Sequence, residues 1–489
     1  MSWKEAAEPV LSRMPVVERP TGHVPFKRKL TWTAGILIVY FFLTNINPFG
    51  LAATQGSDFF GQFRSVLAGE SGSLLQVGIG PIVTASIVLQ LLGGANLLGL
   101  DTDDPRDQVL YQGLQKLLVI VVTALTAAPM VFTGEFLPAD PAVGQALGIG
   151  TAGVEALIFV QIFIGGVLLL FMDEIVSKWG VGSGVGLFII AAVSQQIVGG
   201  FFSFSALGAS GFFANWYSIA TGGTQLGSPF TSAGLESLLF EPGNVLALFT
   251  TVFIFGIVVY AESVRVEIPL SHARVKGARG RFPVKLIYAS VLPMILVRAL
   301  QANIQFVGQL LSSQWAAMPA WLGQYSDQGQ PTSGLFYYLN PIQQPEQWMW
   351  FRGEATGEPW MIAVRLAIDL TFMIVGGAIF AIFWVETTGM GPEATAKQIQ
   401  NSGMQIPGFR RNPQVVEKVM ERYIPQVTVI GGALVGFLAV MANLLGTIGQ
   451  VSGTGLLLAV SITYKLYEEI AEEQLMEMHP MMRQMFGNE

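Results

Sequence analysis

Ten apolar segments, separated by polar connections, restrict the folds open to this chain more than any other feature of its sequence. They fall near residues 30–47, 79–93, 112–133, 153–175, 184–202, 243–262, 286–311, 361–385, 424–446 and 451–470. A helix needs roughly 20 apolar residues to cross a hydrocarbon core about 30 Å thick. Only helices and closed barrels satisfy all backbone polar groups inside lipid. The sequence therefore predicts an all-α, polytopic membrane protein with ten transmembrane helices.

The composition agrees with a membrane protein and excludes several kinds of chemistry. The chain is 52% hydrophobic and 12% charged, whereas about 25% of the residues of an average soluble protein are charged. It contains no cysteine, which excludes disulfides and thiolate metal sites, and its only imidazoles are those of His23, His272 and His479. We expect no metal site and no cofactor. The net charge of −7, with acidic residues on exposed ends, suits a host with high internal salt.

The distribution of lysine and arginine predicts the topology. The N-terminal segment carries Lys4, Arg13, Arg19, Lys27, Arg28 and Lys29, while the loops near 134–152 and 203–242 carry no basic residue. The positive-inside rule then predicts that both termini are cytoplasmic, as part of a multi-pass protein of the cytoplasmic (cell) membrane. The first 30 residues are polar and lead into a long apolar run, so we expect no cleavable signal peptide.

Two long cytoplasmic connections, 263–285 and 386–423, are basic and are candidates for docking a partner. In the first, Val266, Ile268 and Leu270 alternate with other residues ahead of a turn at 277–280. Such alternation predicts a β-hairpin.

Five spans precede and five follow the middle of the chain, and the two sets start on opposite sides of the membrane, as in an inverted repeat around a central pore. The predicted units are a cytoplasmic amphipathic segment (1–29), an N-terminal half (30–202), an external loop (203–242), a C-terminal half (243–470) and a cytoplasmic tail (471–489).

The second span is too short to cross a membrane by itself. Its apolar body, Ile79 to Leu92, follows Gly78 and includes Gly80 and Pro81 near its start. Irregular backbone at membrane depth is tolerated only where it is buried in protein or lines an aqueous cavity. The sequence therefore predicts a broken span beside a cavity.

A short amphipathic helix is predicted ahead of this break, at about 57–68. Its apolar residues, at helical spacing behind a Ser57 or Asp58 N-cap, are Phe59, Phe60, Phe63, Val66 and Leu67. The helix either plugs a funnel from outside or lies flat on the outer leaflet, and its sequence is compatible with both.

Few ionisable residues lie within the spans, which argues against an ion-driven carrier. Arg365 and Asp369 are one helical turn apart and are predicted to pair with each other. Arg298 is alone in the seventh span. It is predicted either to pair with Asp58 or Glu70 and hold the plug, or to extend outward to the membrane surface.

Several sequence stretches together resemble the SecY family of protein-translocation channels in its archaeal form. They are "GIGPIVTASIVLQLL", "DEIVSKWGVGSGVGLFI", "RVEIPLSHARVKGARG", "FWVETTGM", "GFRR" and "GTGLLLAVSITY", and the match runs from about residue 20 to 480. The resemblance implies the pore-forming subunit of a channel that moves secretory polypeptides across the membrane and releases membrane helices laterally. It implies no covalent catalysis.

The resemblance also implies roles for individual residues. The pore ring would be Ile79, Val83, Val185, Ile189, Ile295 and Leu458. The helix break would be Gly78, Gly80 and Pro81, with the plug at Phe59, Phe60, Phe63, Val66 and Leu67. The lateral gate, between spans two and three on one side and seven and eight on the other, would include Thr84, Gln90 and Asn303. Arg274, Arg410 and Arg411 would dock a partner.

The partners implied by the resemblance are SecE-type and Secbeta-type small membrane subunits, the ribosome, the nascent polypeptide with its signal sequence, and the lipid bilayer. The sequence has no G-x-x-x-x-G-K-[ST] motif, so we expect no direct nucleotide binding by a P-loop. The alternative is a secondary transporter with inverted repeats and a broken helix at its substrate site. Whether a polypeptide or a small solute occupies the pore distinguishes the two.

Overall fold

The structure of the chain is a computed structural model. The residues that it describes are 3–11, 13–22, 24–52, 63–94, 98–99, 105–134, 136–203, 211–224, 227, 230–240, 243–272, 279–287, 291–315, 318–326, 329–352, 355, 357–401, 404–405, 413–449 and 451–478.

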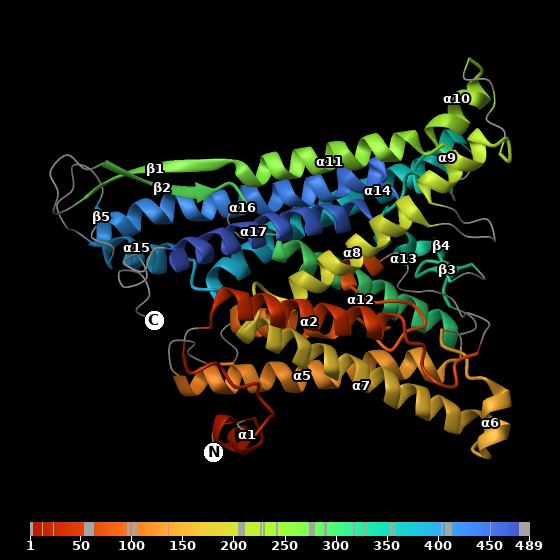
Figure 1. The fold of residues 1–489 in the computed structure, drawn as a ribbon, viewed down its shortest axis with the longest axis horizontal. Coiled ribbons are helices and arrows are strands. Elements are labelled where there is room, and N and C mark those ends of the chain that lie inside the picture. Colours follow the sequence, from red (N-terminus) through yellow and green to blue (C-terminus); the bar gives the residue numbers. More distant parts are fainter. Residues whose placement is uncertain are drawn as a thin grey trace.

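Each of the ten predicted spans corresponds to one long helix (Figure 1). The helices are α2 (Phe26–Thr44), α4 (Gly80–Gly94), α5 (Pro105–Phe132), α7 (Gly150–Trp179), α8 (Gly184–Phe202), α11 (Val245–Ser263), α12 (Leu292–Gln314), α14 (Pro359–Thr387), α16 (Pro413–Leu445) and α17 (Gly453–Met478). By length and composition, seven of them could cross a membrane: α5, α7, α8, α11, α12, α14 and α16. The short apolar α4 confirms the predicted incomplete span.

Several helices extend past the predicted apolar segments because their ends pack against protein. α16 begins 11 residues before the predicted 424, and Val416, Met420 and Ile424 are buried against α14 and α15 (Pro392–Asn401). α12 begins at Leu292 rather than near 286 and ends at Gln314 rather than near 311; the strand that precedes it ends at Lys285.

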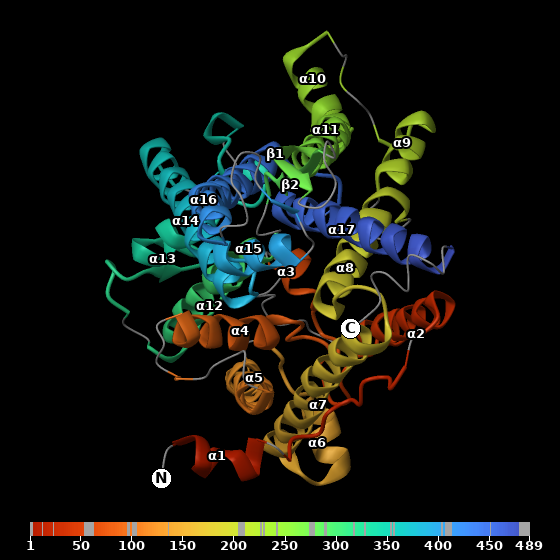
Figure 2. The same cartoon turned by 90° about the vertical axis from the view of Figure 1, so that its left-hand side faces the viewer.

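Viewed along the helices, the first five long helices lie on one side of the molecule and the last five on the other (Figure 2). The short helix α3 (Arg64–Leu67) lies at the centre, where it contacts α8, α12 and α17. The helical, multi-span architecture that was predicted is therefore confirmed.

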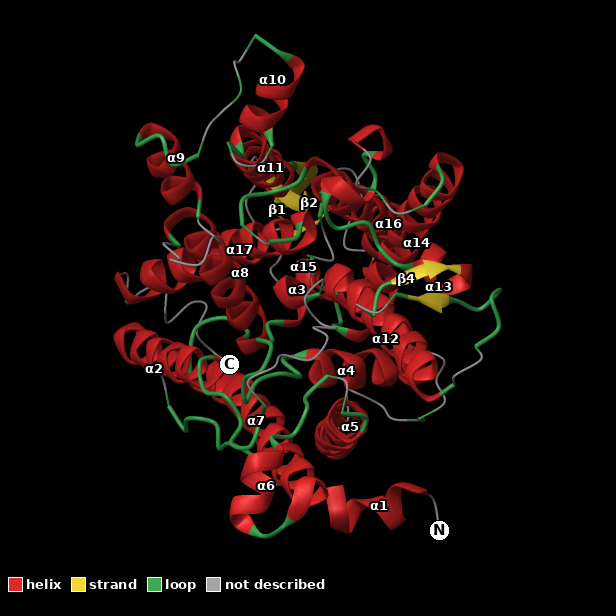
Figure 3. Cartoon of the chain, turned by 90° about the vertical axis from the view of Figure 1, so that its right-hand side faces the viewer, coloured by secondary structure: helices red, strands yellow, loops and turns green. Residues whose placement is uncertain are grey.

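Shorter elements cluster at the two ends of the helices. α1 (Trp3–Leu11), α15 and three strands lie at one end (Figure 1). The opposite end carries α6 (Pro141–Leu147), α9 (Phe212–Ala220), α10 (Ser232–Leu239), α13 (Gly334–Leu339), two 3-10 turns (Pro345–Gln347 and Trp350–Arg352), and β3 (Gln324–Tyr325) paired with β4 (Pro331–Ser333) (Figure 3).

The predicted hairpin is confirmed, and it is one of two small sheets that an all-α description leaves out. β1 (Arg265–His272) pairs antiparallel with β2 (Arg279–Lys285), and β5 (Met404–Gln405) pairs with the other edge of β1. Glu468 near the end of α17 accepts hydrogen bonds from Arg265, at 2.8 Å, and from Lys285. The hairpin is thereby tied to the last helix.

The segment after α1 is hydrogen-bonded to side chains of α5 and α7. Lys116 Nζ donates to the Pro15 carbonyl at 3.0 Å, and Lys178 Nζ donates to the Val17 carbonyl at 2.6 Å. Both ammonium groups also bind the carboxylate of Glu174. The N-terminal segment thus lies on the end of the molecule that also carries the hairpin.

The break before α4 depends on a residue without a side chain at position 78. Gly78 has φ +57°, a left-handed conformation, and a Cβ there would collide with the Leu67 carbonyl and lie 2.7 Å from the Gly69 nitrogen. The next residue, Ile79, donates its N–H to the same Leu67 carbonyl at 2.7 Å. Gly78 therefore lets the chain turn from α3 into α4 without losing this bond.

We predict that Gly78→Ala lowers the free energy of unfolding by about 1–3 kcal/mol, because alanine is strained in this conformation and collides with backbone. Denaturant titration in mixed micelles measures the change. Gly93→Ala in α4 is the matched control, since a Cβ there meets no atom within 4 Å, and it should leave stability unchanged or raise it by up to about 1 kcal/mol. Equal effects of the two substitutions would contradict this reading.

Candidate pore, plug and lateral gate

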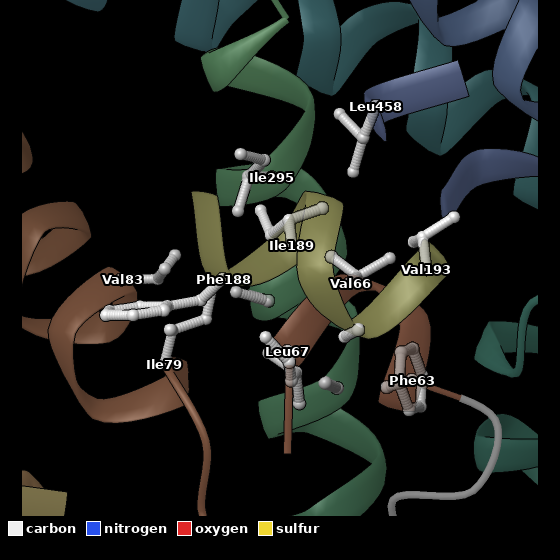
Figure 4. Packing of buried hydrophobic residues seen from close by; sticks show 14 of the residues in the cluster. Phe63, Val66, Leu67, Ile79, Val83, Phe188, Ile189, Val193, Ile295 and Leu458 are labelled. Atoms are coloured by element: carbon white, nitrogen blue, oxygen red, sulfur yellow. The ribbon is translucent and has the colours of Figure 1, made fainter. Parts of the chain in front are cut away.

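Five of the six predicted ring residues meet in one buried hydrophobic cluster (Figure 4). Ile79 directly precedes α4, Val83 comes from α4, Ile189 from α8, Ile295 from α12 and Leu458 from α17, and each is at most 4% exposed. The Val83 N–H donates to the Ile79 carbonyl at 3.0 Å, so Ile79 and Val83 lie one helical turn apart on the same face. Aliphatic side chains from four helices, two in each half, thus lie together in this cluster.

Val185, the sixth predicted ring residue, lies at the edge of this cluster. It is only partly buried, and it also packs against a second, smaller cluster that includes Ile82 and Leu170. The structure therefore brings it near the ring but does not enclose it there.

Part of the predicted plug packs against the ring. Phe63, Val66 and Leu67 are 2–3% exposed and belong to the same cluster as the ring residues (Figure 4). Such burial among helices of both halves is incompatible with a helix lying on the outer leaflet, so that alternative is wrong for these residues. Phe59 and Phe60 lie outside the described residues, and the described part of the helix is four residues long.

Polar contacts hold α3 from three sides. Ser65 Oγ donates to Gln196 Oε1 on α8 at 2.6 Å and accepts the Ser452 N–H at 3.2 Å. The Tyr40 hydroxyl on α2 donates to the Ala68 carbonyl at 2.8 Å. No local sequence pattern indicates these contacts, because they join residues far apart in the chain.

The chemistry of the site is that of a dry constriction. A narrow neck lined by aliphatic side chains disfavours water and can block ions by dewetting. Here Phe63, Val66 and Leu67 belong to the same buried cluster as the predicted ring residues. In this state the centre of the molecule is closed.

Two of the three predicted gate residues meet across the boundary between the halves. Asn303 Nδ2 on α12 donates to Thr84 Oγ1 on α4 at 2.9 Å. Gln90 on α4 is also buried, but its Oε1 atom finds no hydrogen-bond partner in the described part of the chain. α4 also contacts both α12 and α14.

Arg298 does not extend outward to the membrane surface, and it does not pair with Glu70. Its side chain is 1% exposed and pairs with Asp369, with Nη1 3.4 Å from Oδ1. Glu70 pairs instead with Arg64, at 3.0 Å, and Asp58 lies outside the described residues. Because α12 and α14 pack together, a carboxylate on α14 reaches an arginine that is far away in sequence.

The predicted Arg365–Asp369 couple is wrong for the same reason. Arg365 donates through Nε to the Asn340 carbonyl at 2.7 Å and through Nη2 to the Pro341 carbonyl at 3.1 Å, and its guanidinium lies over the ring of Tyr337. It therefore fixes the segment that follows α13 to α14, while Asp369 faces α12.

The predicted docking residues Arg274, Arg410 and Arg411 lie outside the described residues. The described strands β1 and β2 flank the first, and β5 and α16 flank the other two. Among the described residues, no three His, Asp or Glu side chains are grouped so that they could hold a metal ion.

Comparison with known proteins identifies the family. The SecY family model matches residues 73–467, and the model for the plug domain of Sec61p matches residues 38–72. The protein translocase subunit SecY of Haloferax volcanii, a halophilic archaeon, is 75% identical over the full length of both chains. This similarity agrees with the acidic composition expected for a high-salt host.

Two solved structures share the fold. One concerns the plug domain of SecY, described as stabilising the closed state of the translocation channel and maintaining a membrane seal. It is 38% identical, has a TM-score of 0.78, and the match covers 97% of this chain and 98% of that one. The other, Sec61 in the canine ribosome-channel complex from the endoplasmic reticulum, is 36% identical with a TM-score of 0.76 and the same coverage. This chain belongs to the SecY family of protein-translocation channels.

Proposed function

We propose that this chain lines the path of secretory polypeptides across the cytoplasmic membrane, and that the aliphatic cluster at its centre is the constriction of that path. The observation that carries the proposal is the packing of α3 against ring residues from both halves. Membership of the family removes the secondary transporter from consideration. The proposed function is the transport of polypeptides, without covalent catalysis, a cofactor or direct nucleotide binding.

The closed state is sealed twice, by the ring and by the plug. Leaving the ring costs α3 its apolar contacts and the hydrogen bonds of Ser65 to Gln196 and Ser452. Once α3 has moved, a polypeptide in extended form meets only aliphatic side chains. These offer no fixed hydrogen-bond partner, so chains of varied sequence pass without being held.

The lateral gate opens between α4 with α5 on one side and α12 with α14 on the other. The Thr84–Asn303 hydrogen bond that crosses it is worth about 0.6–2 kcal/mol in a membrane. Burying a single leucine of a signal helix gains roughly 1.5–3 kcal/mol. A signal helix with several such residues therefore outweighs the bond, whereas a polar segment does not.

The proposed layout keeps the two halves at 30–202 and 243–470, with both termini on the cytoplasmic side. There, the connections at 263–285 and 386–423 present Arg274, Arg410 and Arg411 to a ribosome. The hairpin is a firm base for such docking because Glu468 ties it to α17. SecE-type and Secbeta-type subunits complete the channel within the bilayer.

We predict that a single cysteine at Ile79 or Ile295 crosslinks to a stalled secretory nascent chain in membranes, and only when that chain carries a signal sequence. The chain has no native cysteine to interfere. Ile38→Cys is the matched control, because Ile38 on α2 is 70% exposed in the structure and should face lipid rather than the polypeptide. Crosslinks at other positions but at neither ring position would contradict the ring, and no crosslink at any position would contradict the path.

We predict that bridging cysteines at Thr84 and Asn303 with a short bismaleimide blocks both lateral insertion and translocation, because the gate can no longer part. The two native side chains are already in hydrogen-bond contact at 2.9 Å. Insertion of a model membrane helix into vesicles measures the effect. The same double variant treated with a monofunctional maleimide is the control, and equal insertion after both treatments would show that the gate lies elsewhere.

A further inference from the structure

A polar network is buried in the C-terminal half, centred on Arg298. Arg298 Nη1 donates to Gln301 Oε1 at 2.7 Å and lies 3.4 Å from Asp369 Oδ1, while Nη2 donates to Thr454 Oγ1 at 3.1 Å. Gln301 Nε2 also donates to Asp369 Oδ1, at 3.1 Å. The side chains of Arg298 and Asp369 are each 1% exposed. The network thus joins α12 to both α14 and α17.

The network lies one helical turn from the ring on two helices at once. On α12, Arg298 follows Ile295 by three positions, and on α17, Thr454 precedes Leu458 by four. Positions three or four apart lie on the same helix face. The Arg298–Thr454 hydrogen bond therefore spans the same two helices as the Ile295–Leu458 side of the ring and limits how far apart they can move.

The link continues into α16. The Thr454 N–H donates to Asn443 Oδ1 at 2.8 Å, and the Thr454 hydroxyl lies 3.2 Å from the same oxygen. Asn443 is fully buried on α16. Four helices of the C-terminal half, α12, α14, α16 and α17, are in this way connected through one hydrogen-bonded group.

Stability alone does not account for such a group. Removing two charges from water is costly, and well-packed apolar side chains often replace a buried ion pair without loss of stability. The cost is greater here because Arg298 Nε and Asp369 Oδ2 are buried without a hydrogen-bond partner among the described residues. What this geometry supplies, and apolar packing does not, is a directional connection between specific points on three helices.

We propose that Arg298, Asp369 and Thr454 are positioning residues that hold Ile295 and Leu458 at the spacing the closed ring requires, and that keep α12 and α14 together as one side of the lateral gate. The proposal rests on the proposed ring. Loss of the network lets α12 move away from α17, and the closed channel then leaks small ions.

The test compares Thr454→Val and Asp369→Asn with Thr463→Val in proteoliposomes, using chloride efflux through the idle channel as the readout. Thr463 is the matched control, because it lies on the same helix and its hydroxyl donates to the Ala459 carbonyl of its own turn and to no other group among the described residues. We expect at least a fivefold faster efflux for the first two variants and less than a twofold change for the control. Thermal unfolding of each variant is measured alongside.

The double variant Arg298→Met/Asp369→Leu distinguishes two explanations of a leak: loss of the link from Arg298 to Thr454, and an unpaired buried charge. It removes the charges in an apolar setting but does not restore the link to Thr454, so we expect it to remain leaky. Tight channels in this double variant, or in Thr454→Val despite lower stability, would overturn the proposal. Each substitution is also made in a separate Ile79→Cys background that is used only for nascent-chain crosslinking and not for efflux, so that crosslinking reports independently on the translocation path. If the native background also fails to crosslink, the proposed path is at fault rather than the network.

Discussion

Backbone polar groups at membrane depth must find partners inside the protein, and this requirement shapes the centre of the molecule. The second span is too short to cross the membrane as one helix. The backbone N–H and C=O groups at its N-terminal break lie at a depth where lipid offers no hydrogen-bond partner. The structure meets the requirement with the protein's own groups. Ile79 donates to the Leu67 carbonyl, and Tyr40 donates to the Ala68 carbonyl. These bonds hold the preceding segment in the middle of the helices. The contacts that satisfy the backbone groups at the break therefore also place the plug segment.

Apolar contacts form the centre of the molecule, and polar contacts surround them. The ring itself is purely aliphatic, which suits a path that must not bind what it conducts. Directional hydrogen bonds lie around it: Ser65 bonds to Gln196 and Ser452, Asn303 donates to Thr84, and Arg298 donates to Thr454 and pairs with Asp369. This arrangement keeps the centre apolar, while a few polar contacts around it set its shape.

The sequence predicted the features that depend on local pattern. Hydropathy located all ten long helices, the shortness of the apolar run from Ile79 to Leu92 and its leading glycines located the break, and alternation in β1 located the hairpin. The ring and the Thr84–Asn303 pair came from the resemblance to the family, because a single aliphatic residue in a span does not reveal which way it faces.

Long-range pairing was not predictable from one sequence. Arg365 and Asp369 are neighbours on one helix face, so the local pattern favoured a couple, yet Asp369 pairs with Arg298, 71 positions away. The pairing follows from how α12 and α14 pack, which no local pattern encodes. The same holds for Ser65 and Gln196, separated by 131 positions. Helix ends were misplaced where amphipathic turns of α16 are buried by protein rather than by lipid.

The most direct test of a plugged aliphatic constriction is the accessibility of a single cysteine at Leu67. In the closed structure Leu67 is 3% exposed and packs with the ring. A membrane-impermeant maleimide added from the external side should label Leu67→Cys slowly in the idle channel and at least tenfold faster once a nascent chain occupies the pore. Equal labelling rates in the two states would contradict the account.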